Sequence, residues 1–353
     1  MRTNHDIKRG VSLYSYQNHY YFKKMSLEDC IAAVADLDAE GFEIMPEMMI
    51  PEFPHISDDF AAKWHGWMQQ YDVTPIALTH FADRLMWKNR QMTDDELYER
   101  SVLYIKAANK LGCKVIRLMH SYHGGKPNAS SMYISPCDLI NPKIVERLLP
   151  VCEEYDVTMA LECHAPTSID DPCHQEYLEV AEKTGIKRVG LMADMSSFQI
   201  KDSKASRDFH VRKGGNPDII DYLREVGSRK HRGEEIDLDE VRAYLKEHNA
   251  NEIDWAYFNS RVEFAMVATT NETLKKYASQ LVYIHAKFLW AEEDGTIEEI
   301  DYPGAIKALQ EGGYKGFINS EFEGNRWMSD LGLTPEIEMV RRQHVLFKNL
   351  LGY

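Results

Sequence analysis

Short apolar runs alternate with longer amphipathic stretches along most of the 353-residue chain. Short apolar and β-branched runs are typical of buried strands, whereas apolar residues that recur at helical spacing indicate helices. The predicted strands are residues 10–16, 42–45, 75–80, 114–120, 157–164, 189–195, 281–288 and 315–322. The predicted helices are a stretch capped by Ser26 and ended by Gly41, then residues 57–71, 94–111, 141–155, 175–183, 260–278, 302–310 and 334–350.

Eight strand-then-helix units joined by short turns predict an α/β fold, a (β/α)8 TIM barrel. The alternative is a doubly wound open sheet, but that fold leads us to expect a glycine-rich turn after the first strand, and residues 15–18 contain no glycine. The rhythm breaks at residues 199–258, which hold two charged helical patches at 218–230 and 237–248. We therefore expect one barrel domain over residues 1–353, with residues 199–258 as a helical insertion between strand six and its following helix.

The last four predicted strands each end in a possible metal ligand. The four residues are Glu162, Asp194, His285 and Glu321. A TIM barrel carries its working residues at the carboxyl ends of its strands, so these side chains are expected to meet at one face. Three carboxylates and one imidazole form an oxygen-rich site that suits Mn²⁺ or Mg²⁺, with Fe²⁺ or Co²⁺ possible. The sequence therefore predicts a metal centre.

Other polar residues near strand ends are candidates for catalysis or substrate contact. His164 lies two positions after Glu162 on the same strand face, and is either a catalytic base or a histidine that only holds a neighbour. Lys287 follows His285 by the same step and either stabilises an oxyanion or neutralises the carboxylates. The remaining candidates for substrate contact are His80, His120, His123 and Glu47. The alternative for the three histidines is a solvent-exposed loop position.

Composition and charge exclude some classes of protein. The chain carries 41 basic and 56 acidic residues, a net charge of −15, which repels a nucleic-acid backbone. The six cysteines contain no CxxC pair and are interpreted as reduced thiols. No apolar leader and no long apolar run occurs in the sequence. We expect a soluble, cytoplasmic protein.

The ligand pattern of Glu162, Asp194, His285 and Glu321, with His164 beside the first, resembles the xylose-isomerase-like superfamily of sugar isomerases and epimerases. Residues 10–16, residues 161–164 and the helical insertion look most like the α subunit of bacterial C-glycoside deglycosidases. This resemblance implies Mn²⁺ at the four ligands and His164 as the base. It also implies a small β subunit in a hetero-oligomer and a 3-oxo-C-glucoside of a flavonoid-type aglycone as substrate.

The expected activity is therefore that of a metal-dependent carbon–carbon lyase, which removes a proton α to the carbonyl and eliminates the aglycone. The nearest alternative is a ketose 3-epimerase or sugar isomerase, which needs a second acid or base on the opposite face of the substrate. Only Glu47 and Glu323 are loose carboxylates that suit this role. A metal-dependent apurinic endonuclease is disfavoured by the negative charge, and a non-catalytic scaffold is disfavoured by the intact ligand set.

Overall fold

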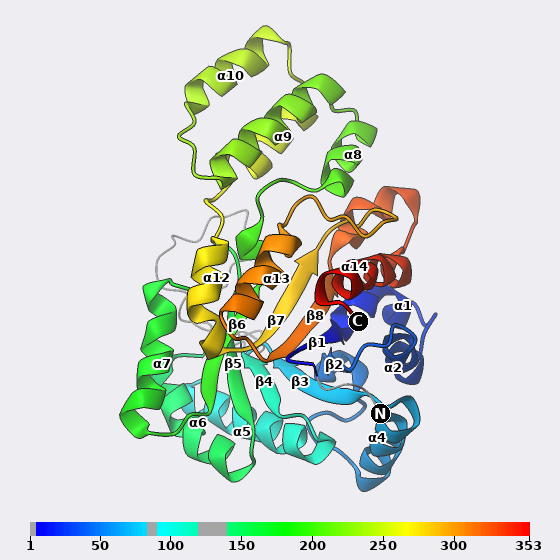
Figure 1. Ribbon diagram of the computed structural model, residues 1–353, viewed down its shortest axis with the longest axis vertical. Coiled ribbons are helices and arrows are strands. Elements are labelled where there is room, and N and C mark those ends of the chain that lie inside the picture. Colours follow the sequence, from blue (N-terminus) through cyan, green and yellow to red (C-terminus); the bar gives the residue numbers. More distant parts are fainter. Residues whose placement is uncertain (1–4, 83–89, 119–139) are drawn as a thin grey trace.

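The computed structural model describes residues 5–82, 90–118 and 140–353. Its parallel strands close into a barrel in the order β1 to β8 (Figure 1), which confirms the predicted (β/α)8 class. The strands are β1 (Ile7–Ser12), β2 (Gly41–Ile44), β3 (Thr74–His80), β4 (Val115–Leu118), β5 (Thr158–Cys163), β6 (Val189–Asp194), β7 (Leu281–Phe288) and β8 (Gly316–Phe322).

Helices surround the barrel and extend beyond one end of it (Figure 1). The α-helices are α1 (Gln17–Tyr21), α2 (Leu27–Ala35), α3 (Pro46–Met49), α4 (Asp58–Tyr71), α5 (Asp94–Leu111), α6 (Pro142–Glu154), α7 (Pro172–Thr184), α8 (Lys204–Arg212), α9 (Pro217–His231), α10 (Leu238–Glu247), α11 (Glu252–Tyr257), α12 (Asn271–Tyr277), α13 (Tyr302–Glu311) and α14 (Glu336–Leu351). Short helical turns include η1 (Leu13–Tyr16), η4 (Met195–Phe198), the π-helical η5 (Phe258–Glu263) and η7 (Gly324–Trp327).

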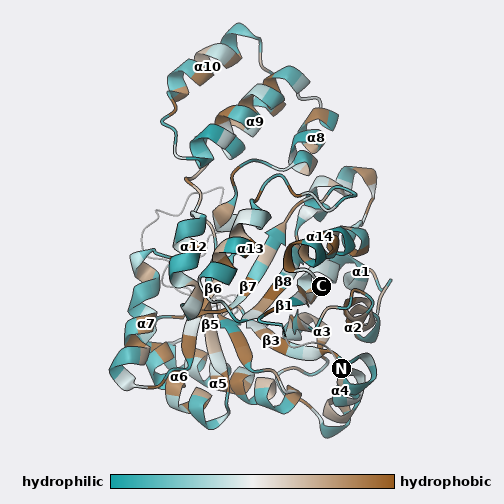
Figure 2. Ribbon diagram, in the orientation of Figure 1, coloured by the Kyte–Doolittle hydropathy of each residue, from teal (hydrophilic) through white to brown (hydrophobic). Residues whose placement is uncertain are grey.

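Local chemistry sets the ends of the outer helices. Ser26 and Asp29 form a reciprocal capping box at the start of α2, in which each side chain accepts from the other residue's backbone N–H. Helix α5 ends at Gly112, whose φ of 79° is in the left-handed region that favours glycine. Figure 2 shows hydrophobic residues along the barrel strands and hydrophilic ones on outer helices such as α12. The outer helices therefore cover a buried apolar wall.

The first strand differs from its prediction. Residues 13–16 were expected to continue the strand, but they form the turn η1. Ser15 explains the turn, because its hydroxyl donates to the carbonyl of Ser320 and accepts from the N–H of Phe322. The turn therefore folds the end of β1 against the end of β8, and it buries Leu13.

The helix predicted at 260–278 is also shorter than expected. Its first part is η5, residues 264–270 belong to no helix, and α12 begins only at Asn271. The backbone of this middle segment bonds elsewhere, since the N–H of Ala268 donates to the carbonyl of His231 and that of Thr269 to the carbonyl of Ser197. These tertiary contacts replace the helical hydrogen bonds that the apolar spacing had suggested.

Helices α8 to α11 lie between β6 and α12 and stand beyond the barrel in Figure 1. The two charged patches predicted as helices correspond to α9 and α10. These helices pack around a hydrophobic cluster of their own, separate from the barrel core, which includes Ile220, Leu223 and Leu245. An ion pair between Arg224 and Glu298 links α9 to the segment that follows β7.

Within the barrel, the register between β6 and β7 places Asp194 opposite His285.

Candidate active site and metal centre

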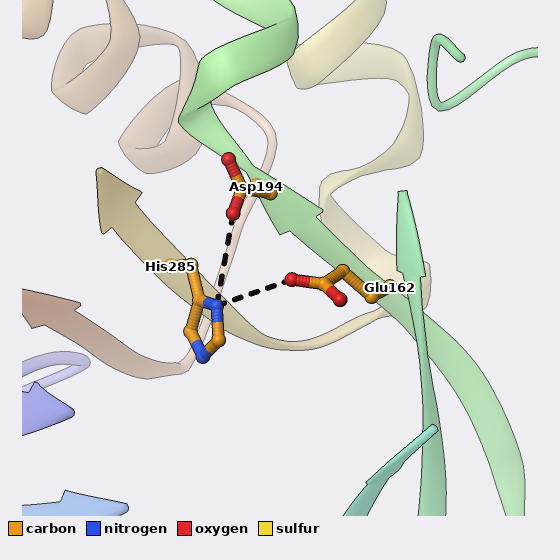
Figure 3. Close-up of side chains that lie close together, drawn as sticks. All are labelled: Glu162, Asp194 and His285. Carbon is orange, nitrogen blue, oxygen red and sulfur yellow. Dashed lines mark ion pairs between the residues drawn. The ribbon is translucent and has the colours of Figure 1, made fainter. Parts of the chain in front are cut away.

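Three buried side chains converge at the carboxyl ends of β5, β6 and β7 (Figure 3). The Nδ1 atom of His285 lies 3.4 Å from Oε1 of Glu162 and 3.8 Å from Oδ2 of Asp194. One ligand atom from each residue lies within 4.8 Å of the other two. This spacing suits joint coordination of one cation.

The fourth predicted ligand approaches the same nitrogen from β8. Oε2 of Glu321 lies 3.3 Å from Nδ1 of His285. The three carboxylates predicted as ligands therefore each place an oxygen within 3.8 Å of Nδ1 of His285. Four consecutive strands supply these carboxylates and His285, as expected where parallel strands end together.

Glu43 on β2 holds the opposite side of the His285 ring, and the sequence analysis missed it. Its Oε2 lies 2.6 Å from Nε2 of His285, and both side chains are buried. A carboxylate accepts, so Nε2 carries the hydrogen and Nδ1 faces the other three carboxylates. This carboxylate–histidine arrangement is the one that orients metal-binding histidines in proteins. The available signal was a charged residue inside the apolar strand at residues 42–45.

The buried donor atoms and the net charge of this cluster both suit a bound cation. Oε1 of Glu162 and Nδ1 of His285 are buried and make no hydrogen bond within the described chain. Oδ2 of Asp194 and Oε2 of Glu321 are also buried, and the Lys287 ammonium lies 3.1 and 3.3 Å from them. The buried groups include four carboxylates (Glu43, Glu162, Asp194, Glu321) and two permanent cations (Arg117, Lys287). In the protonation state that joint metal binding requires, with all four carboxylates ionised and no proton on Nδ1 of His285, the two excess negative charges match one divalent cation. Buried charge without a partner is costly, so the donor set fits a metal.

The ligand ionisation states follow from their neighbours. Burial opposes the charged form of Glu162, but Arg117 and His285 outweigh it and lower the pKa of the carboxyl group. Burial likewise opposes the charged form of Asp194, but Lys287, His164 and His285 together lower the pKa of this carboxyl group well below its ordinary value. Burial also opposes a charged His285, yet Glu321 and Glu43 raise the pKa of the imidazole well above its ordinary value.

Arg117 on β4 is a second residue that the sequence analysis missed. Its Nη2 lies 2.5 Å from Oε2 of Glu162, and both side chains are buried. The guanidinium therefore occupies one carboxylate oxygen and leaves the other, Oε1, toward His285. The signal was again a charged residue within an apolar run.

Lys287 connects the ligands to His164. Its Nζ lies 3.1 Å from Oδ2 of Asp194, 3.3 Å from Oε2 of Glu321 and 3.4 Å from Oε1 of Glu323. The same Nζ lies 3.1 Å from Nε2 of His164. Burial disfavours the ammonium, but these carboxylates raise the pKa of Lys287 well above its ordinary value. A charged lysine thus sits between the ligand cluster and the candidate base.

The contacts of His164 fix its tautomer. Its Nδ1 lies 2.5 Å from the carbonyl oxygen of Ala165, which only accepts, so Nδ1 carries a hydrogen. The Lys287 ammonium only donates, so Nε2 of His164 accepts. His164 is therefore neutral in this arrangement, with a basic nitrogen beside Lys287.

A cavity of about 680 Å³ opens over these groups. Residues of the site that line it include Glu43, Arg117, Glu162, His164, Lys287 and Glu321. Farther out, the lining includes Arg261 and the exposed apolar side chains of Phe264, Met266 and Val267. Helices and loops after β6 therefore build the outer wall of the cavity.

The structure corrects the expected orientation of His80. Thr79 and Phe81 line the cavity, so alternation along β3 turns His80 to the opposite face. There it is fully buried, 3.0 Å from Oγ of Ser101 on α5, and stacked on Tyr104. Burial, followed by the charges of nearby arginines, lowers the pKa of His80 to about 3.

Glu47 also lies away from the described lining of the cavity. It is on α3, where its carboxylate pairs with Arg100 at 2.6 Å and accepts from the hydroxyl of Tyr104. The short helix turns the residue outward from the end of β2, which the strand register alone did not predict. His120 and His123 lie outside the described residues, and their contacts with substrate stay predictions.

Residues 31–343 match the protein family described as "Xylose isomerase-like TIM barrel". The chain therefore belongs to this family. Within it, the chain is 28% identical to a protein named C-glycoside deglycosidase alpha subunit from Arthrobacter globiformis, over 98% of this chain and 92% of that protein. It is 25% identical to a protein named 3'-dehydrocarminate deglycosidase alpha subunit from a Microbacterium species, over 97% and 95% of the two chains. These similarities confirm the resemblance inferred from the sequence.

A solved structure of similar fold, described as IOLI protein with a binding zinc atom, has a TM-score of 0.55 and 14% identity, with 98% of each chain covered. At this identity the match supports the fold alone. Among the helices that the structure describes, none is both long enough and apolar enough to cross a membrane.

Proposed function

We propose that this chain is a metal-dependent lyase that cleaves the carbon–carbon glycosidic bond of a 3-oxo-C-glucoside. The observation that carries the proposal is the position of the basic Nε2 of His164, which Lys287 links to the ligand cluster in one cavity. The relatives named deglycosidase, one of them for a 3'-dehydro compound, support the same choice of substrate.

The reaction begins with proton removal. A divalent cation held by Glu162, Asp194, His285 and Glu321, with Mn²⁺ as first choice and Mg²⁺, Co²⁺ or Fe²⁺ as alternatives, would supply Lewis-acid polarisation of the 3-oxo group and acidify the adjacent C2–H. His164 accepts that proton at Nε2, whose lone pair becomes free when Lys287 transfers its hydrogen bond from this nitrogen to the negative charge that develops on the sugar. Each unit by which the pKa of the C–H bond falls lowers the free-energy cost of its ionisation by about 1.4 kcal/mol.

Elimination follows from the same residues. The electron pair of the C2–H bond forms a C1=C2 double bond while the bond between C1 and the aglycone carbon breaks. Lys287 stabilises the negative charge on the sugar, because its ammonium already faces the site. The aglycone carbon takes the released pair and requires a proton.

The size and lining of the cavity support a glycoside with a large aglycone, such as a flavonoid. A volume of about 680 Å³ is in the range that accommodates drug-sized ligands. Phe264, Met266 and Val267 give the outer part an apolar wall suited to an aromatic ring system.

The epimerase alternative needs a second acid or base facing the substrate from the other side. Glu47 pairs with Arg100 outside the described lining of the cavity. Glu323 pairs with both Lys287 and Arg326. Neither carboxylate is poised as a partner for His164, so the lyase is the better supported function.

We also propose a small β subunit as partner in a hetero-oligomer, because the relatives are named alpha subunits. A cytoplasmic location is proposed from the buried thiols of Cys30, Cys113, Cys152 and Cys163, which form no disulfide within the described residues.

A product assay tests the proposed function. The full chain, alone and with its small subunit, is incubated with Mn²⁺ or with chelator. The substrates are a 3-oxo-C-glucoside of a flavonoid and a panel of free ketoses. Metal-dependent aglycone release is the expected result, whereas epimerised ketose without aglycone release contradicts the lyase.

A further inference from the structure

Glu299, in the segment between β7 and α13, is a buried carboxyl group that the steps above leave unused. It is 1% exposed and lines the same cavity. Its Oε1 accepts from the N–H of Leu289 at 2.8 Å and of Trp290 at 3.1 Å. Its Oε2 is buried without a hydrogen-bond partner among the described residues. One oxygen is thus anchored by two backbone N–H groups, and the other makes no hydrogen bond among the described residues.

The charges around Glu299 favour the protonated acid. The adjacent Glu298 pairs with Arg224 and Lys201, whereas no ion pair to Glu299 occurs within the described residues. Burial without a cation raises the pKa of Glu299 to about 7, and the two backbone N–H groups oppose this effect only in part. Glu299 therefore holds a proton for a substantial part of the time near neutral pH.

Tyr302 connects Glu299 electrostatically with the ligand cluster. Its hydroxyl donates to the carbonyl of Lys287 at 2.7 Å. Burial, then the charge of Glu299, and then that of Asp194 raise the pKa of Tyr302 well above its ordinary value. The anchoring N–H of Leu289 also lies only two residues beyond Lys287. Glu299 and the ligand cluster therefore act on the same buried hydroxyl group, that of Tyr302.

We propose that Glu299 is the acid that protonates the departing aglycone carbon, an inference that rests on the proposed lyase function. The pair of the C1–aglycone bond moves to the aglycone carbon, which takes the proton from Oε2 of Glu299. The C2 proton is on His164, so each proton has one donor and one acceptor. The resulting carboxylate keeps its bonds to Leu289 and Trp290, which stabilise the negative charge.

The alternative role for Glu299 is only to bind the backbone after β7. Glu299→Gln separates the two roles, because a glutamine oxygen still accepts from both N–H groups but the side chain donates no acidic proton. Glu293→Gln is the matched control, since Glu293 is exposed in the same segment.

The test uses the Mn²⁺-loaded full chain with its small subunit and three readouts. These are exchange of the C2 hydrogen of a 3-oxo-C-glucoside with deuterium from D₂O, release of its aglycone, and release of 4-nitrophenol from the 3-oxo O-glucoside. Nitrophenolate is a stable anion that leaves without protonation. Glu299→Gln is expected to slow C-aglycone release by about 10²–10⁴-fold, the usual contribution of a general acid. Deuterium exchange and nitrophenol release stay within about twofold of wild type, and Glu293→Gln matches wild type in all three.

Other results overturn the assignment. Unchanged C-aglycone release in Glu299→Gln removes Glu299 from the reaction, and equal loss of all three readouts assigns it a purely structural role. If the wild-type complex neither exchanges C2 nor releases aglycone, the proposed function itself fails. Exchange and release in wild type with no effect of Glu299→Gln refute only the acid.

A second measurement needs no variant. Release of the C-aglycone by wild type is expected to fall as pH rises above about 7, because Glu299 then loses its proton. Nitrophenol release lacks this loss. The other titratable groups facing Glu299 are Glu298, which is ion-paired, and Tyr302, whose raised pKa keeps it neutral here. Parallel pH profiles for the two substrates contradict the proposal.

Discussion

Glu43 and His285 form a buried hydrogen bond of 2.6 Å across the barrel, from β2 to β7. The bond places the hydrogen on Nε2 and directs Nδ1 to the carboxylates of Glu162, Asp194 and Glu321. Glu43, which is not among the predicted ligands, thereby orients the imidazole of His285, the one nitrogen donor among the four predicted ligands.

Glu43→Gln is expected to weaken Mn²⁺ binding by about 10–100-fold, the usual cost of losing the partner of a metal-bound histidine. The reason is that a neutral amide makes the ring less basic and fixes its orientation less firmly. Calorimetric titration of the metal-free chain measures the affinity. Glu47→Gln is the control, because Glu47 contacts Arg100 instead of His285. Equal affinity in wild type and Glu43→Gln would show that His285 is not a ligand oriented by Glu43.

His164→Asn is expected to slow C2 deuterium exchange and aglycone release together by about 10²–10⁴-fold, because the base for proton removal is lost. Mn²⁺ affinity is expected to change little, since His164 contacts Lys287 and Ala165 instead of a predicted ligand. Exchange at the wild-type rate in this variant would rule out His164 as the base. Loss of metal as well as activity would make it a ligand.

Lys287→Met removes the ammonium that lies among the carboxylates of Asp194, Glu321 and Glu323. The metal-free protein is expected to lose about 3–5 kcal/mol of unfolding free energy, because buried negative charge is left unpaired. Mn²⁺ then raises the melting temperature more in the variant than in wild type, since the cation replaces the lost positive charge. Thermal unfolding with and without Mn²⁺ measures both effects. An equal metal-induced rise in the two proteins would count against competition between Lys287 and the cation.

His80 gives a pH dependence of stability that is unrelated to activity. Its folded pKa, about 3, lies below the ordinary 6.5, so the unfolded chain binds a proton more readily. Its contribution to stability is fully present above pH 6.5 and is lost as pH falls toward 3, by about 1.4 kcal/mol per pH unit. His80→Gln retains a bond to Ser101 but does not titrate. Urea unfolding at pH 7 and pH 5 should show a smaller loss in this variant than in wild type, and identical losses would contradict the buried placement.

The sequence was sufficient to predict the barrel and the convergence of Glu162, Asp194, His285 and Glu321, because both follow from local rules. Apolar runs mark the strands, and period-two alternation places Glu162 beside His164 and His285 beside Lys287 on one face. Parallel strand ends then meet without further information.

Other residues could not be assigned this way, because their roles depend on contacts between distant parts of the chain. Glu43 and His285 are 242 positions apart. Arg117 belongs to an apolar run, and no local pattern reveals that it pairs with Glu162 on the next strand. Glu299 lies in a segment without a regular period, and only its burial and backbone contacts distinguish it from the paired Glu298. The prediction of one continuous helix at 260–278 was wrong for a similar reason, since the carbonyls of His231 and Ser197 accept hydrogen bonds from the backbone of this segment.

The most direct test of the central claim is a titration of the metal-free chain with Mn²⁺. The proposed small subunit is present, and aglycone release from a 3-oxo-C-glucoside is recorded. Release is expected to rise from a background level to a plateau at one equivalent of Mn²⁺ per chain. In Asp194→Asn, which weakens one ligand of the cluster, the rise should require a large excess of metal. Release at full rate in the thoroughly chelated wild-type complex would contradict the account.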